Sequence, residues 1–244
     1  MLKVIKWIGI ILGVLFIAGF IFFKVASDPK PTGEQGAAAD VLAHKMLTAI
    51  NKPAWDSTRY VQWNFAGLHD FLWDKEQNLV EVTWGNNRVL LNPDEISGKA
   101  WKDGKMLDNP DKLVKKAWSF FCNDAFWLNA PAKVFDPGTE RSLVQLENGE
   151  EALLITYTSG GVTPGDSYLW ILDENGLPKS FKMWVKIIPL KGMESTWEDW
   201  VELPTGAKIS TTHDTKGFAA KVTNLKAGQT LEEMGREKVF DELE

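Results

Sequence analysis

The chain has 244 residues, with 27 Lys or Arg against 33 Asp or Glu, which gives a formal net charge of -6. This acidic balance excludes the concentrated basic face that nucleic-acid-binding domains usually carry, so we expect no nucleic-acid partner. With an N-terminal apolar segment set aside, roughly 200 residues remain, enough for one β-rich core. The 12 tryptophans predict that this core contains many large flat side chains, some of which line a cavity.

The N-terminal segment, residues 7–23, carries no charge and is flanked by Lys3, Lys6 and Lys24. As a helix it spans about 25 Å, close to the hydrocarbon thickness of a bilayer. We expect residues 1–27 to form a single transmembrane anchor, because Lys24 stands where a cleavage site needs small neutral groups. A cleaved signal sequence, which leaves a secreted or periplasmic protein, is the alternative. The preceding lysines favour a cytoplasmic N-terminus and an exported domain, periplasmic or extracellular.

The next stretch, residues 28–36, combines Pro29, Pro31, Gly33 and Gly36 without an apolar pattern, as expected of a linker between membrane and domain. The domain itself is predicted to occupy residues 37–244. It opens with residues 37–50, whose apolar positions recur at helical spacing and predict an amphipathic helix packed on the domain. A period of two then predicts strands and a short hairpin, at residues 60–65, 69–74, 79–84, 88–91 and 98–107.

A helical insertion, residues 110–129, interrupts the strands. Asn109 is a candidate cap at its start, and Pro110 is tolerated in a first helical turn. Trp118 and Phe121 lie on one apolar stripe of the predicted helix, and a second short helix is expected within residues 123–131. So much apolar surface on an insertion indicates that the helix covers something, as a lid does.

Strands are expected again at residues 142–146 and 152–158, followed by a four-strand antiparallel meander over residues 166–214. In its second strand Phe181 and Met183 alternate with Lys182 and Trp184, which predicts one buried and one solvent-facing side. A last strand is expected at residues 220–225. The spacing of Thr230 and Glu233 then matches a capping box that opens a final helix to residue 243.

These elements predict a mainly β fold, namely a curved antiparallel sheet or incomplete barrel with an N-terminal amphipathic helix and a helical lid. Their order, together with Trp197-Glu198-Asp199-Trp200 followed by Pro204-Thr205-Gly206, resembles the lipoprotein-carrier or outer-membrane lipoprotein-sorting family. The resemblance covers most of residues 37–214. It implies an exported domain whose hydrophobic cavity binds acyl chains or a related apolar ligand without chemistry. A carrier of this family is soluble, whereas the predicted anchor would tether this chain.

Catalytic and metal-binding residues are not evident. The histidines His44, His69 and His213 are scattered, with no pair at the i, i+4 separation of a helical metal site. Cys122 is interpreted as a buried small side chain rather than a nucleophile, since a cysteine nucleophile needs a partner base and an exposed, electropositive setting. Asp199 is of interest only if it turns inward between Trp197 and Trp200. We therefore expect no catalytic residue, no metal and no cofactor.

The sequence leads to three hypotheses about function. The first is a membrane-anchored envelope protein that binds a lipid or lipoprotein acyl chain. The second is an interaction module that holds another envelope protein, and the third is a hydrolase using Asp199 or His213. For the first hypothesis, alternation along the strands and the stripe on the insertion predict a cavity, lined by Trp63, Phe65, Phe71, Trp73, Trp84, Trp118, Phe121, Phe181 and Met183.

Overall fold

The computed structural model describes residues 7–8, 11–14, 19, 26–160, 163–215 and 217–243. The predicted anchor, residues 7–23, therefore lies mostly outside the described residues, and so does Lys24. Among the residues that the structure describes, none of the helices has the length and apolar character needed to cross a membrane.

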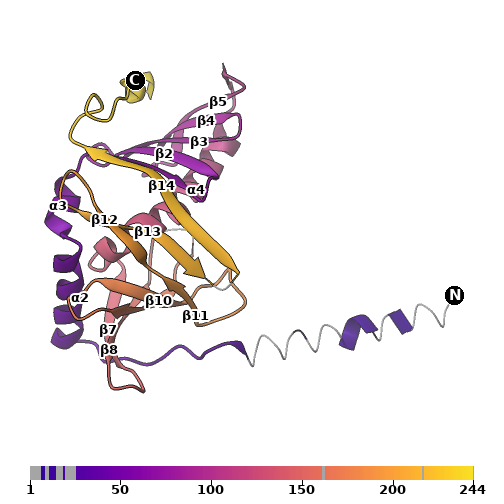
Figure 1. The fold of residues 1–244 in the computed structure, drawn as a ribbon. Coiled ribbons are helices and arrows are strands. Elements are labelled where there is room, and N and C mark those ends of the chain that lie inside the picture. The colour runs from indigo at the N-terminus through magenta and orange to yellow at the C-terminus, as the bar shows by residue number, and fades with distance from the viewer. Residues whose placement is uncertain are drawn as a thin grey trace.

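The described chain folds into β-strands with a few helices (Figure 1). The helices are α2 (Ala37–Ala49), α3 (Lys52–Ser57), α4 (Asp111–Asn129), and the 3-10 turns η1 (Ala130–Lys133) and η2 (Val239–Leu243). The strands are β1 (Tyr60–Phe65), β2 (His69–Asp74), β3 (Leu79–Trp84), β4 (Asn87–Asn92), β5 (Ser97–Lys102), β6 (Lys105–Met106), β7 (Thr139–Gln145), β8 (Glu151–Tyr157), β9 (Ser167–Leu172), β10 (Pro178–Trp184), β11 (Met193–Thr196), β12 (Glu198–Glu202), β13 (Lys208–Thr215) and β14 (Phe218–Gly228).

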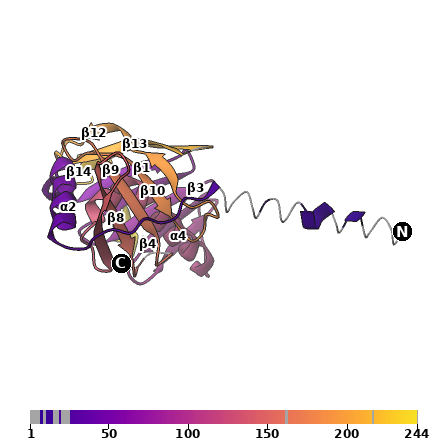
Figure 2. The same cartoon turned by 90° about the horizontal axis from the view of Figure 1, so that it is seen from below.

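The strands form one 14-stranded antiparallel sheet in the order β6-β5-β4-β3-β2-β1-β14-β13-β11-β10-β9-β8-β7, with β12 paired to β13 beside this path. The sheet is open and curved (Figures 1 and 2), and the strand order places β6 and β7 at its two edges. This confirms the prediction of a mainly β, antiparallel fold. β1, β2 and β3 have the bounds expected from their alternation, and α2 ends one residue before the predicted helix.

Within the predicted four-strand meander, where the sequence indicates one continuous strand over residues 195–202, the structure has two strands, β11 and β12. The break lies at Trp197, which is 2% exposed and inserts into the core beside Trp170, with ring centroids 5.0 Å apart. Two residues later Asp199 takes a left-handed backbone conformation with φ 51°. Burial of a large indole thus overrides continuous strand pairing here, an effect that the period of two does not reveal.

The helical insertion is one continuous helix, α4, so the predicted second short helix is wrong. No glycine or proline interrupts residues 111–129, and nothing therefore stops the first helix. The prediction of an Asn109 cap is also wrong, because Pro110 occupies the cap position and no side chain bonds there. α4 packs against β4, β5 and β13, so it crosses the concave face of the sheet (Figure 1).

The expected linker, residues 28–36, packs on the sheet over its length. Asp28 accepts a hydrogen bond from the Trp184 indole nitrogen at 2.8 Å, and its carboxylate pairs with Lys182 at 3.0 Å. Glu34 forms an antiparallel bridge with Leu143 of the edge strand β7. Trp184, predicted to face solvent, is 9% exposed because this segment covers it. The prediction for Trp184 was wrong since alternation cannot show that another segment lies on the outer face.

The C-terminal capping box forms without the predicted helix. Glu233 accepts a hydrogen bond from the Thr230 amide at 3.3 Å and donates its own amide to the Thr230 hydroxyl at 3.2 Å. The chain then turns at Gly235, whose φ of 68° lies outside helical space, and residues 229–235 form turns. A capping box satisfies the free amides at the start of a helix. It does not prevent a glycine a few residues later from ending the helix after its first turn.

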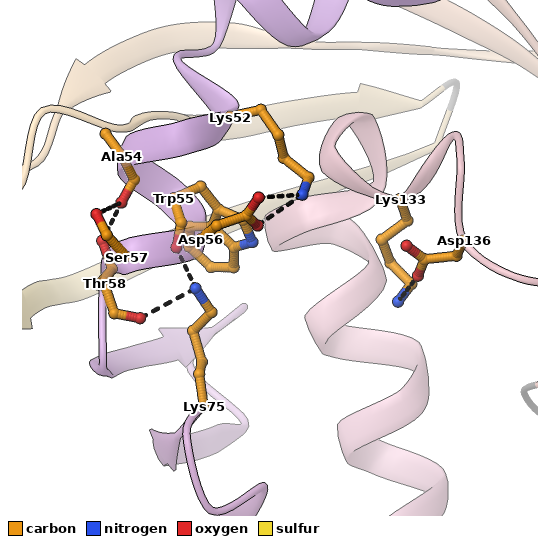
Figure 3. A network of polar contacts seen from close by, with 9 residues as sticks. All are labelled: Lys52, Ala54, Trp55, Asp56, Ser57, Thr58, Lys75, Lys133 and Asp136. Atoms are coloured by element: carbon orange, nitrogen blue, oxygen red, sulfur yellow. Dashed lines mark hydrogen bonds and ion pairs between the residues drawn. The ribbon is translucent and has the colours of Figure 1, made fainter.

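A half-buried lysine, Lys75, contacts the C-terminal end of α3 (Figure 3). Lys75 donates to the carbonyl oxygens of Trp55 and Thr58 at the C-terminal end of α3, and its ammonium lies 4.1 Å from the Trp55 ring centroid. A cation at a helix C-terminus interacts favourably with the helix dipole. Burial nevertheless lowers the pKa of Lys75 to about 8.

Candidate functional site

An open cleft of about 840 Å³ runs along α4, within the size range of ligand pockets. Its walls come from α4 on one side and from two separate parts of the sheet on the other, β1 with β2 and β8 with β10. Most of the lining side chains are apolar, and those that contribute large surfaces are Phe65, Trp73, Phe120, Phe121, Phe126, Trp127, Tyr157, Tyr168, Met183 and Val185.

The residues predicted to line a cavity divide into two sets. The set on the cleft wall is Phe65, Trp73, Phe121 and Met183. The remaining five do not line it. Trp63, Phe71 and Phe181 are fully packed in the core, and Trp84 and Trp118 are half-buried against the core that contains Trp63 and Phe71.

The reason for this division is packing between neighbouring strands. Trp63 on β1 stacks on Phe71 on β2 with ring centroids 4.6 Å apart, and Phe121 of α4 closes over both at 6.4 and 6.3 Å. Alternation places Trp63 and Phe65 on the same face of β1. It does not show which of the two meets a neighbour and which meets open space.

A polar pair that the sequence did not indicate lies on the cleft wall. The His69 Nδ1 and the Asp124 Oδ2 are 2.7 Å apart, and Asp124 accepts a second hydrogen bond from Asn123 at 2.9 Å. The His69 ring also stacks on Phe120 at 3.8 Å. Burial raises the pKa of Asp124, while the hydrogen bonds from Asn123 and His69 oppose that rise. His69 and Asp124 are 55 positions apart, so no local spacing connects them.

Two more polar groups of the cleft are buried without a hydrogen-bond partner in the described part of the chain. They are the Tyr157 hydroxyl on β8 and the side-chain oxygen of Asn129 at the end of α4. Burial, reinforced by Tyr168 and Asp136, raises the pKa of Tyr157, so this side chain remains a neutral hydroxyl. A buried donor or acceptor left unpaired is costly, and a ligand group that pairs with it removes that cost.

At the same end of α4, Lys133 and Asp136 line the cleft as an ion pair with an N–O distance of 2.5 Å (Figure 3). Both side chains are partly exposed, and each charge is balanced by the other, so neither is a buried unpaired charge. The cleft therefore combines apolar walls with a few neutral or paired polar groups.

The other residues weighed for catalysis are placed as follows. Cys122 lines the cleft, and burial raises the pKa of its thiol to about 11, which keeps it protonated. Asp199 is exposed and accepts a hydrogen bond from the Thr212 hydroxyl at 2.7 Å, so it does not turn inward. His213 is fully buried 4.4 Å from the Trp197 ring, and burial lowers its pKa to about 4.

No cluster of three or more His, Cys, Asp or Glu side chains suited to a metal ion occurs within the described ranges.

Fold and cleft define this chain as an open antiparallel β-sheet protein with an apolar cleft under one helix. No known protein family matches the sequence, and no curated protein matches it. Among solved structures it is similar to a DUF1329 family protein from Desulfovibrio piger ATCC 29098, with 10% identity over 84% of this chain and 99% of that chain and a TM-score of 0.41. A likeness of this size assigns neither a family nor a function to this chain.

Proposed function

We propose that this protein is a membrane-anchored envelope protein whose exported domain binds the acyl chain of a lipid or lipoprotein without catalysing a reaction. The observation that carries the proposal is the mostly apolar cleft of about 840 Å³ along α4. Each methylene moved from water into such a cleft contributes about 0.8 kcal/mol, so a chain of ten contributes roughly 8 kcal/mol before the cost of ordering it. Residues 1–27 would hold the domain at the membrane that contains this ligand.

The polar groups of the cleft support an amphiphilic ligand rather than a pure hydrocarbon. Among the described residues, the Tyr157 hydroxyl and the Asn129 side-chain oxygen have no hydrogen-bond partner, and the His69–Asp124 pair also lines the cleft. A few placed polar groups among apolar walls fix the orientation of a ligand in a binding site. We expect the ligand's polar head to meet one of these groups while its chain lies along Phe121 and Phe126.

The His69–Asp124 pair favours a second candidate function, that of a hydrolase. A carboxylate that orients an imidazole supplies two of the three members of a catalytic triad. The third member is a nucleophile that is hydrogen-bonded to the imidazole. Among the described residues, no Ser, Thr or Cys side chain hydrogen-bonds to His69, and Cys122 is held as a thiol. Binding without catalysis therefore ranks first.

Photo-cross-linking in the membrane tests the proposal on the full chain. A photoreactive phenylalanine analogue at Phe121, on the cleft wall, should form adducts with the mass of a lipid or acyl chain. The same analogue at Val201, which is 40% exposed on β12 and is not part of the cleft, provides the matched control. Protein adducts at Phe121 would instead favour the interaction module. Equal lipid adducts at both positions, or none at Phe121, would contradict ligand binding in the cleft.

A further inference from the structure

Three large apolar side chains stand exposed around the mouth of the cleft. Leu68 is 62% exposed, Ile187 is 71% exposed and Phe218 is 51% exposed, and all three line the cleft. Single exposed apolar residues are common on protein surfaces, whereas a group gathered at the opening of an apolar cleft indicates an interaction surface. We call these residues, with the half-buried Ile188 that also lines the cleft, the rim.

The topology explains why the rim residues meet although they are far apart in sequence. Leu68 lies in the turn between β1 and β2, Phe218 begins β14 after the β13–β14 turn, and Ile187 lies in the loop between β10 and β11. β1 pairs with β14, and the Ala66 amide donates to the Lys221 carbonyl at 2.8 Å. β11 pairs with β13, and β13 with β14. These turns therefore project from the same end of the strands.

The loop that carries Ile187 has the composition of a membrane-contacting segment. Residues 185–192 read VKIIPLKG, with two lysines and no acidic residue. Lys191 is tied inward, since its ammonium donates to the carbonyl oxygens of Val185 and Ile188, whereas Lys186 is exposed. Cations beside apolar side chains suit the anionic head groups and acyl region of a lipid surface.

Most acidic groups near this loop are hydrogen-bonded or ion-paired, including Glu194 of β11, which accepts a hydrogen bond from the Ser180 hydroxyl at 2.6 Å. Asp166 is buried and accepts a hydrogen bond from the Lys186 amide at 2.8 Å, and Asp28 is paired with Lys182. Asp70 accepts a hydrogen bond from Asn64 at 3.0 Å near the β1–β2 turn, and Asp214 is exposed on β13. The tip of the loop therefore presents the charge of Lys186 and apolar side chains to a membrane.

The chain from the predicted anchor arrives at this same loop. The Asp28 amide donates to the Lys191 carbonyl at 3.0 Å, and the Lys191 amide donates to the Ser27 hydroxyl at 3.1 Å. A Cβ added at Gly192, whose φ is 75°, would approach the Asp28 Cβ to 2.4 Å, so the two segments are in close contact. Ser27 and Asp28 thus lie beside the loop that carries Ile187 and Ile188 of the rim.

We propose that the rim is a membrane-contact surface, through which the cleft opens directly onto the lipids of the bilayer that residues 7–23 span. The inference rests on the anchoring part of the proposed function. Only a few residues separate the predicted span from Ser27, and Ser27 and Asp28 are hydrogen-bonded to Lys191, so a span at residues 7–23 would bring Ile187 and Phe218 to the bilayer surface. An acyl chain then passes between bilayer and cleft without crossing water. This route avoids the free-energy cost of exposing the apolar chain to water.

Environment-sensitive labels on the full chain test this surface. On a Cys122→Ala background, single cysteines replace Ile187 or Phe218 in the rim, and Val201 or Met106 as controls. Met106 is 63% exposed on the edge strand β6, so the controls are also exposed apolar residues outside the cleft. Each variant is labelled with the fluorophore NBD and reconstituted into nanodiscs of phosphatidylcholine and phosphatidylglycerol. Circular dichroism confirms that each variant is folded.

We expect NBD emission from both rim positions to shift to shorter wavelength and to be quenched by spin-labelled lipid, with no shift and no quenching at Val201 or Met106. Rim labels that behave like the controls would overturn the membrane contact, even if the Phe121 cross-linker still captures lipid. Rim labels that enter the bilayer while Phe121 captures no lipid would support the contact and reject the ligand-binding cleft. The two proposals are thereby separated.

Discussion

Two aromatic-rich regions lie side by side in this protein, and only one of them is open. Under β9, β10 and β11 the rings of Trp170, Phe181 and Trp197 pack at centroid distances of 5.0 to 5.8 Å and are fully buried. Phe126 of α4 lies 6.4 Å from Phe181 and yet lines the cleft. The same residue types therefore fill one space and border another.

What stays open along α4 depends on how each part of the helix meets the sheet. Toward β4 and β5 the helix presents Val114 and Ala117, whose small side chains allow close approach and are buried. Toward β9 and β10 it presents Phe126 and Trp127, whose rings lie 4.6 Å from Tyr168 and 5.4 Å from Phe181. An aromatic-rich sheet does not by itself define a cavity, because the position of the covering helix decides what stays open.

The largest expected effect comes from truncating the filled region. Phe181→Ala should destabilise the protein by about 3–5 kcal/mol, because it removes a fully buried ring and leaves a cavity. Phe126→Ala, the matched control across the contact, should cost about 1 kcal/mol because the ring already borders open space. Urea unfolding of the protein in nanodiscs, followed by tryptophan emission, measures both. Equal losses would mean that the two regions are packed alike.

A smaller effect is expected from acid, through the buried histidine of the filled region. The folded-state pKa of His213 is lowered from 6.5 to about 4 by burial, so between these values the unfolded chain binds more protons. Stability should therefore fall as the pH drops from 6.5 to 4, by about 3 kcal/mol from this group, with no further loss from it below that window.

The control for this prediction is His213→Phe, which keeps a ring beside Trp127 and Trp197 and does not titrate. Unfolding in urea at pH 7 and pH 4.5 should show a smaller loss in the variant than in the wild type. The same pH dependence in both proteins would show that His213 is not the group responsible.

The smallest effect is expected at the cleft wall. Asp124→Ala removes the acceptor of the His69 and Asn123 hydrogen bonds and should cost about 2 kcal/mol, since it leaves partly buried donors without partners. Asp214→Ala, an exposed carboxylate on β13, should stay within about 0.5 kcal/mol of the wild type. Thermal unfolding of both variants is the measurement. No difference between them would indicate that the Asp124 pair has no role in holding β2 against α4.

The sequence predicted the strands far better than the cleft, because strand signals are local. The bounds of β1, β2 and β3 follow from alternation over six residues and from turn residues beside them. The open space depends instead on how α4 sits over strands that are distant in sequence. The contact between His69 and Asp124 spans 55 positions and leaves no local pattern. The covering of Trp184 by Asp28 spans 156 positions and was missed for the same reason.

The most direct test of the central claim is fluorine NMR of the full chain labelled with 5-fluorotryptophan in nanodiscs, with resonances assigned by single Trp→Phe substitutions. When a fatty acid is added, the resonances of Trp73 and Trp127 on the cleft wall should shift and saturate. Those of Trp63, Trp170 and Trp197 in the filled core should stay unchanged. Shifts of the core resonances without shifts of Trp73 and Trp127, or no saturable shift at all, would contradict a ligand held in the cleft along α4.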